Sequence, residues 1–132
     1  MTIIPLSIEE RAASGLTHAV TVDYNDVTQS TLISLPRGTV VGRVAVSVGT
    51  NWNSGTSAAL SVGTTASATA YINAVNLLAA GDEYYLYNTG AVIIAASQFL
   101  VVTLAVAGTA ATAGKCTIGL QLVDLTQLPV GA

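Results

Sequence analysis

Charged side chains are scarce in this chain: they make up 8% of its 132 residues, against about 25% in a typical globular domain. The four basic residues are scattered at Arg11, Arg37, Arg43 and Lys115, and the formal net charge is −3. No basic cluster could neutralise a row of phosphates, so we expect no nucleic-acid partner. The stretch 44–81 carries no charge at all, which favours a subunit covered by other subunits over a free monomer.

Cysteine and histidine occur once each, which excludes most catalytic and redox arrangements. Cys116 cannot form an intrachain disulfide, and we interpret it as a small buried hydrophobe, with pairing between chains as the remote alternative. A hydrolytic triad needs a His held by a carboxylate. On a strand beginning near residue 17, however, His18 would face the opposite side from Asp23. We therefore expect no enzymatic activity and no cofactor.

Two acidic segments suggest metal binding or acid–base chemistry, but neither has the residue pattern that this chemistry requires. The segment "DYNDVT", residues 23–28, has Val27 at the third ligand position of a calcium loop and no Gly at the sixth, so it is better interpreted as a turn closed by Asn and Asp side chains. Asp82 and Glu83 would project to opposite faces of a strand, so we interpret them as a solvated turn after Gly81. We expect no metal site.

Targeting and membrane signals are weak. The N-terminus "MTIIPLSIEERAASG" lacks the basic flank and long apolar run of a secretory signal, so we expect the protein in the cytoplasm where it is made. The uncharged segment 91–111 is about as long as a membrane span. Ser97 and Gln98 interrupt it, and its second half alternates large with small residues, which is typical of a strand. We therefore expect no membrane partner.

Alternation of apolar and polar residues recurs along the chain and predicts an all-β fold. Val40, Gly42, Val44, Val46 and Val48 would share the inward face of one strand, with Val41, Arg43, Ala45 and Ser47 outward. Comparable patterns occupy residues 17–24, 100–107 and 115–122, and weaker ones occupy 31–35, 58–62, 83–87 and 92–96. About eight strands predict an antiparallel β-sandwich, most consistent with a jelly roll, with an immunoglobulin-like sandwich as the second choice.

Two short helices are compatible with the sequence. Ser7 and Glu10 form a capping-box pattern, and Gly15 is placed to end the helix. A second helix over 68–81 would put Tyr71, Val75 and Leu78 on one face, although β-branched residues make a strand or loop a close alternative. We divide the chain into an N-terminal arm with a short capped helix, residues 1–15, and a single β-sandwich domain, residues 16–132.

Two segments carry the candidate partner contacts. The apolar arm "TIIPL" should dock either on its own domain or on a neighbouring subunit, because such a tail is normally not left in water. The loop "TNWNSGTS", residues 50–57, lies between two copies of SVGT that we interpret as strand ends and not as a sequence repeat. Trp52 in that loop could plug the sandwich end, contact a protein or stack on a sugar. The candidate contact residues are Ile3, Ile4, Pro5, Leu6, Ile8, Trp52 and Asn53.

The block "SLPRGTVVGRVAVSVGTNWNSGTSAALSVGTTASATAYINAVNLLAAG", residues 34–81, resembles a pattern in small structural proteins of tailed bacteriophages. A strand led in by a Pro or Gly turn is followed there by an aromatic and NSG-type loop, an "LSVG" strand and a segment ending in "AAG". The resemblance implies a jelly-roll-like domain on the virion, as a capsid decoration (cement) protein, a head-fibre base or a tail accessory, commonly a homotrimer.

Under that resemblance the expected partner is the major capsid protein or another virion protein, and the expected location is the capsid surface after assembly in the host cytoplasm. A tail or fibre component that recognises a host surface glycan or protein is the main alternative. A free-standing carbohydrate-binding or bacterial surface domain is a third possibility, without the secretion signal that it would need.

Overall fold

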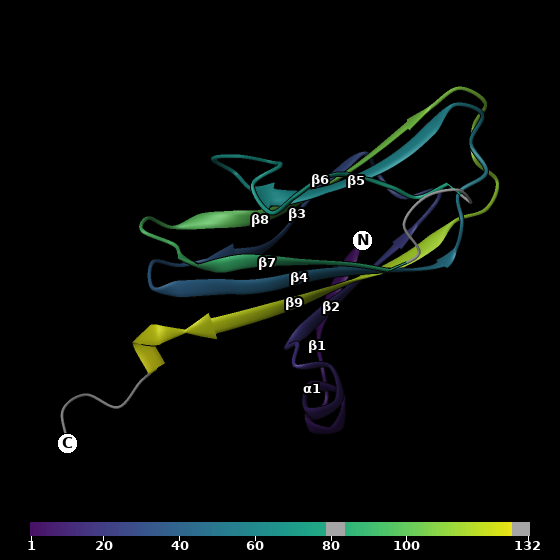
Figure 1. Ribbon diagram of the computed structural model, residues 1–132. Coiled ribbons are helices and arrows are strands. Elements are labelled where there is room, and N and C mark those ends of the chain that lie inside the picture. The colour runs from purple at the N-terminus through teal and green to yellow at the C-terminus, as the bar shows by residue number, and fades with distance from the viewer. Residues whose placement is uncertain (79–83, 128–132) are drawn as a thin grey trace, which may run out of the picture.

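The fold is an antiparallel β-sandwich with one short helix, described by a computed structural model for residues 1–78 and 84–127 (Figure 1). Nine strands form two sheets, of five and four strands. The five-stranded sheet contains β1 (Thr2–Pro5), β2 (His18–Asp23), β9 (Lys115–Asp124), β4 (Thr39–Thr50) and β7 (Tyr84–Ile93), in that order. The four-stranded sheet contains β3 (Gln29–Leu35), β8 (Gln98–Ala107), β5 (Ser57–Thr64) and β6 (Ile72–Asn76). Helix α1 (Ile8–Ser14) follows β1, and a 3₁₀ turn (Leu125–Gln127) follows β9.

The strand order is that of a jelly roll. If β2 to β9 are lettered B to I, the sheets read B-I-D-G and C-H-E-F, with β1 added beside β2. The expected all-β sandwich and its topology are therefore confirmed. The ninth strand is β1, which pairs antiparallel with β2 from Thr2↔Thr21 to Pro5↔His18. The apolar N-terminal segment therefore docks on its own domain, which is the first of the two arrangements that the sequence left open.

The core lies between the two sheets and follows the alternation in the sequence. Val20 and Val22 of β2, with Ile118 and Leu120 of β9, are fully buried on the inward face of the five-stranded sheet. Opposite them, the four-stranded sheet contributes fully or almost fully buried residues at Leu60, Val62, Leu100, Val102 and Leu104. Burying a side chain of this size stabilises the fold by about 1.5–3 kcal/mol, so these positions specify which face of each strand turns inward.

The expected face of β4 is correct in its second half and wrong in its first. Val44, Val46 and Val48 are buried and Arg43 is exposed, as the alternation predicts. Val41, expected outward, is fully buried. The cause is a register shift between Val41 and Arg43 against β9, where Gly42 is an extra residue. One extra residue moves the preceding side chains to the other face.

Two other expectations are corrected. The expected helix over 68–81 is replaced by β6, whose Val75 and Ile72 pair with β5. The expected strand 92–96 is not separate, because β7 runs on to Ile93 and a turn leads into β8. The expected solvated turn at Gly81, Asp82 and Glu83 lies outside the described residues.

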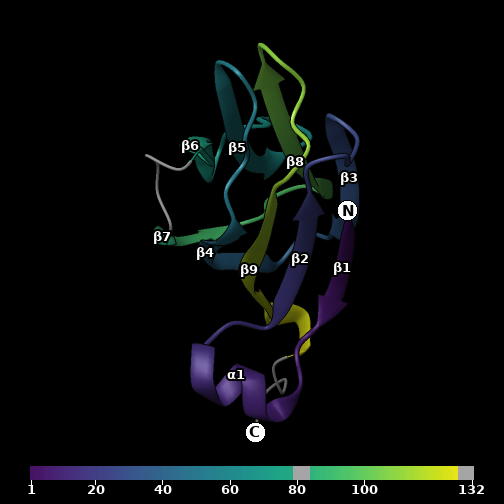
Figure 2. The ribbon, with the colours of Figure 1, turned by 90° about the vertical axis from the view of Figure 1, so that its right-hand side faces the viewer.

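The capped helix is confirmed. The Ser7 hydroxyl accepts from Glu10 N at 3.2 Å, the Glu10 carboxylate accepts from Ser7 N at 3.0 Å, and Gly15 ends the helix in a left-handed conformation with φ 72°. In Figures 1 and 2 the helix stands off the outer side of the five-stranded sheet. No helix among residues 1–78 and 84–127 has the length and apolar character to cross a membrane.

Candidate interaction surface

The outer face of the five-stranded sheet is crossed by a continuous apolar row. The strand registers align Ile4, Ala19, Gly119, Ala45 and Leu86, one residue from each strand. With strands about 4.8 Å apart, this row spans about 19 Å. Its three central members are small, and the large residues stand at the two ends, where Ile4 is 51% and Leu86 is 63% exposed. The row is therefore a shallow apolar trough with raised rims.

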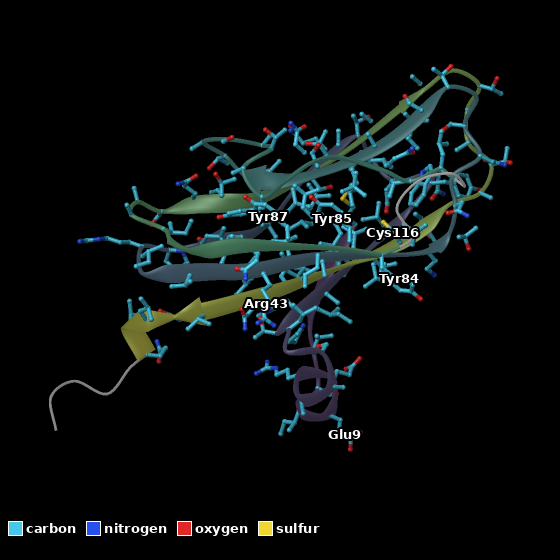
Figure 3. All side chains as sticks on the ribbon, in the orientation of Figure 1. Glu9, Arg43, Tyr84, Tyr85, Tyr87 and Cys116 are labelled. Atoms are coloured by element: carbon cyan, nitrogen blue, oxygen red, sulfur yellow. The ribbon has the colours of Figure 1, made fainter. Side chains whose placement is uncertain are left out.

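A row of hydroxyl side chains runs beside the apolar row. The same registers align Thr2, Thr21, Thr117, Ser47 and Tyr84 across all five strands. Tyr84 is 75% exposed. Figure 3 shows Tyr84 and Arg43 on this outer side of the sheet, while Tyr85, Tyr87 and Cys116 lie between the two sheets. We call the apolar and hydroxyl rows together the outer face.

The helix and the outer face enclose a groove of about 650 Å³. Leu6, Ala13 and Leu16 line its helix side, and Tyr84 and Leu86 line the opposite side. The sheet provides the floor. A Cβ atom at Gly119 would come within 2.4 Å of Leu16 Cδ1, so this glycine lets Leu16 lie directly on the strand. An apolar groove of this size on a protein surface is typical of an interaction site.

Helix α1 buries none of its seven residues, and Ile8 is 86% exposed. Isolated helices of this length are unstable in water, so its local interactions have to hold it. The capping box supplies them, and the backbone and side-chain hydrogen bonds with Ser7 lower the pKa of the Glu10 carboxyl. Arg11 adds a hydrogen bond from Nε to Leu6 O at 3.1 Å. A helix fixed in place with its apolar residues exposed is suited to packing on another molecule.

The candidate residues of the N-terminal arm fall into two groups. Ile3 is half-buried and packs on the core of its own domain, whereas Ile4 and Pro5 are exposed. Leu6 lines the groove and Ile8 is exposed on α1. The structure thus places Ile4 and Leu6 at the outer face and its groove, leaves Ile8 exposed on α1, and gives Ile3 a role within the fold.

Trp52 is not on the surface: it is 2% exposed, and its backbone N–H donates to Leu77 O at 3.0 Å. The indole belongs to the core of its own domain, which is the first of its three interpretations, a plug at the sandwich end. Asn53 is exposed but bound to the loop before β9, where its Oδ1 accepts from Thr112 N and Ala113 N at 2.8 and 3.1 Å.

His18 and Cys116, the two residues considered for catalytic or redox chemistry, have structural surroundings without a catalytic partner among the described residues. His18 begins β2 on the same side as Val20, and its Nδ1 lies 2.8 Å from the Thr17 hydroxyl oxygen, not beside a carboxylate. Burial, with a smaller effect of the Arg11 charge, lowers the pKa of His18. Cys116 is buried, as expected.

The "DYNDVT" segment is a turn. The Asp26 carboxylate accepts from Asp23 N at 2.8 Å, as the sequence predicts, and it also pairs with the Met1 ammonium group at 3.2 Å. Within the part of the chain that the structure describes, no group of His, Cys, Asp and Glu side chains could hold a metal ion.

The scarcity of charge is evident from the sequence, but the two rows of the outer face are not. The alternation shows that Ala19, Ala45 and Gly119 share a side of their own strands with polar residues. Only the register between strands distant in sequence places them in one line. The trough is therefore a property of the pairing.

The fold is similar to that of chains in two solved capsid structures. One match is the acidic stable capsid structure of Helicobacter pylori bacteriophage KHP30, with a TM-score of 0.62 and 17% identity over 79% of this chain and 82% of that chain. Another is the cyanophage Pam1 capsid asymmetric unit, with a TM-score of 0.52 and 19% identity over 77% of each chain. No protein-family model and no curated protein sequence matches this chain. The likeness is one of fold, and it extends over most of all three chains.

Proposed function

We propose that this protein is a non-enzymatic structural subunit of a phage virion, and specifically a capsid decoration (cement) protein bound to the outside of the head. The observation that carries the proposal is the similarity of its fold, over 79% and 77% of the chain, to chains found in two phage capsid structures. The low charge and the apolar row of the outer face, with Ile4 and Leu86 exposed at its ends, are consistent with a subunit that works inside an assembly. The protein would be made in the host cytoplasm and would function on the capsid surface.

The outer face and α1 are the surfaces proposed to be buried on assembly. Ile8 on α1, together with Ile4 and Leu6 of the N-terminal segment, would contact the major capsid protein or another virion protein. Copies of the chain would associate as a homotrimer. Because the trimer binds the assembled shell and not its dissociated parts, mass action would shift the equilibrium against rupture.

A tail or fibre component that recognises a host surface remains the alternative function. Its proposed glycan contact was the Trp52 loop, and the buried indole offers no ring for a sugar to stack on. No other observation favours it over decoration.

The experiment is a binding measurement with a matched pair of variants. We would determine the mass of the purified protein by analytical ultracentrifugation, then its co-sedimentation with expanded capsids of the phage that encodes it. Ile8→Asp should weaken capsid binding about tenfold or more, because it places a charge in an apolar contact. Val27→Asp, which changes an equally apolar residue, 61% exposed, in the loop between β2 and β3, should bind like the wild type. A monomer with no affinity for capsids would contradict the proposal.

A further inference from the structure

Three of the four sheet edges are blunted. At β1, Pro5 has no backbone N–H to offer a further strand. At β3, the register against β8 shifts between Thr31 and Ser34, and β1 of the other sheet contacts this strand. At β6, Ala74 has φ 58° and its N–H is bound by the Ser61 hydroxyl at 3.0 Å. Each of these features hinders pairing with another chain.

The fourth edge, β7, has none of these features over Tyr84–Asn88. The five residues "YYLYN" contain no proline, no glycine and no charge, and they pair with β4 in continuous register from Ser47↔Tyr84 to Arg43↔Asn88. Among the described residues no strand pairs with the other side of β7, which lies at one border of its layer in Figure 2. An uncharged, regular edge of this kind is a template for a further strand.

The hydrogen-bond phase of the sheet can be followed from β1 to β7. Leu6 N donates to Thr17 O across β1 and β2, and Tyr24 N donates to Gly114 O across β2 and β9. In an antiparallel ladder, consecutive residues bond to opposite neighbours. The even-numbered residues of β9 therefore bond to β2 and the odd-numbered ones to β4, and the even-numbered residues of β4 bond to β7.

This phase fixes which backbone groups of β7 are available. Tyr85 and Tyr87 stand opposite even-numbered residues of β4, so their N–H and C=O groups are used within the sheet. The N–H and C=O groups of Tyr84, Leu86 and Asn88 point away from β4, toward the open edge. Two of these residues, Tyr84 and Leu86, also carry large exposed side chains.

We propose that β7 pairs with β7 of a second copy of this chain, antiparallel and centred on Leu86, so that two five-stranded sheets become one continuous sheet. In this register the two Leu86 residues exchange both backbone hydrogen bonds and their side chains meet on the outer face. Tyr84 pairs with the partner's Asn88, and Tyr85 stands opposite the partner's Tyr87. Aromatic pairs opposite each other across strands stabilise a sheet.

The strand that pairs with the open edge of β7 belongs to a second copy of the chain, because residues 84–88 are complementary to the same residues in antiparallel orientation. A twofold contact requires a surface that is complementary to its own copy, and "YYLYN" has a tyrosine on each side of the central leucine. The apolar trough, which ends at Leu86, would continue across the new contact into the second copy. This contact relates chains in pairs, so it is separate from the contacts of the proposed trimer. It does not rest on the proposed capsid role.

Disulfide trapping tests both the contact and its register. Leu86→Cys places two thiols in a hydrogen-bonded pair, about 5.5 Å apart between Cα atoms, which lies within the range of a disulfide. Tyr84→Cys places the like residues about 13 Å apart along the strand, out of range. The native Cys116 is buried, so the introduced thiol is the reactive one. Phe99→Cys, at an exposed position on β8, is the control for random collisions.

We expect Leu86→Cys to form disulfide-linked dimers about tenfold faster than either of the other variants at 0.1 mM protein, since paired strands hold the thiols at millimolar effective concentration. A mixture of Tyr84→Cys and Asn88→Cys should give the mixed dimer. Leu86→Pro, which removes an outward N–H and no bond to β4, should abolish the pairing through β7, so that ultracentrifugation shows half the mass of the wild-type assembly. Equal rates for Leu86→Cys and Phe99→Cys, or faster crosslinking of Tyr84→Cys, would overturn the proposal.

Discussion

The indole of Trp52 fills the space that a side chain at residue 114 would need. A Cβ built on Gly114 would lie 2.4 Å from Trp52 Cδ2, and Gly114 has φ 155°, a conformation that favours glycine. Gly114 comes immediately before β9, whereas Trp52 follows β4. The contact therefore closes one end of the sandwich by joining two segments that are distant in sequence.

Replacing Gly114 should destabilise the fold strongly. Gly114→Ala combines overpacking against the indole with backbone strain, so we expect a loss of about 3 kcal/mol in the free energy of unfolding. Urea denaturation followed by Trp fluorescence measures it. Gly49→Ala is the control, because its nearest neighbour would be at 3.8 Å, and it should change stability by less than about 1 kcal/mol. Similar losses for both variants would refute the tight contact.

The Trp52 side chain can be tested separately. Its Nε1–H is buried and has no hydrogen-bond partner among the described residues. Trp52→Ala should cost about 3–5 kcal/mol by leaving a cavity. Trp52→Phe should cost clearly less, because it keeps much of the ring volume and removes an unsatisfied donor. Far-ultraviolet circular dichroism in denaturant compares the two variants, and equal losses would mean that the N–H has an acceptor.

Cys116 should be unreactive in the folded protein. Burial, with smaller effects of the Asp23 and Asp26 charges, raises the pKa of its thiol from 9.0 to about 12. At pH 8 an aromatic disulfide reagent should label it only after denaturant unfolds the chain. Rapid labelling of the native protein would mean that the strand between β2 and β4 opens.

The same shift gives a pH dependence of known sign. The folded state holds the thiol proton more tightly, so the stability from Cys116 is fully present below pH 9 and is lost as pH rises toward about 12. Between these values the free energy of unfolding should fall by up to about 1.4 kcal/mol per pH unit from this group. The Cys116→Ala variant should lack that part of the slope, which separates it from the titration of Tyr and Lys.

The inward faces of the strands could be predicted because a strand has a period of two. Val20 and Val22, or Ile118 and Leu120, are buried where the alternation places them. Val41 could not be placed, because the extra residue Gly42 shows only in the pairing with β9. A periodic pattern carries information about one strand, whereas a bulge depends on its neighbours.

The sequence predicts that an interaction surface exists, but not where it lies on the fold. Low charge and an apolar arm indicated a subunit of an assembly, and the contact role of Ile4 and Ile8, which are exposed, stays a prediction. The trough can be located only from the register of five strands. The burial of Trp52 depends on packing against Gly114, and nothing in the sequence near residue 52 identifies that partner. Contacts between distant segments decided both outcomes.

Helix α1 should be able to unfold while the sandwich stays folded. It buries none of its residues, so Ser7→Ala, which removes the capping hydroxyl, should cost about 1 kcal/mol of local helix stability and leave the unfolding midpoint of the sandwich unchanged. Amide hydrogen exchange measures this, with faster exchange at Glu10 and Arg11 and the same protection in β9.

Acid should act on the helix in the same way. The Ser7 hydrogen bonds lower the pKa of Glu10, so its contribution is present above the ordinary carboxyl pKa and is lost as pH falls through the lowered value. The protection of the α1 amides against exchange should therefore fall at low pH in Ser7→Ala as in the wild type, because the Ser7 backbone N–H that binds the Glu10 carboxylate is present in both. If Ser7→Ala instead lowered the unfolding midpoint of the whole protein, α1 would be coupled to the sandwich, and its role as a separately folded contact element would be wrong.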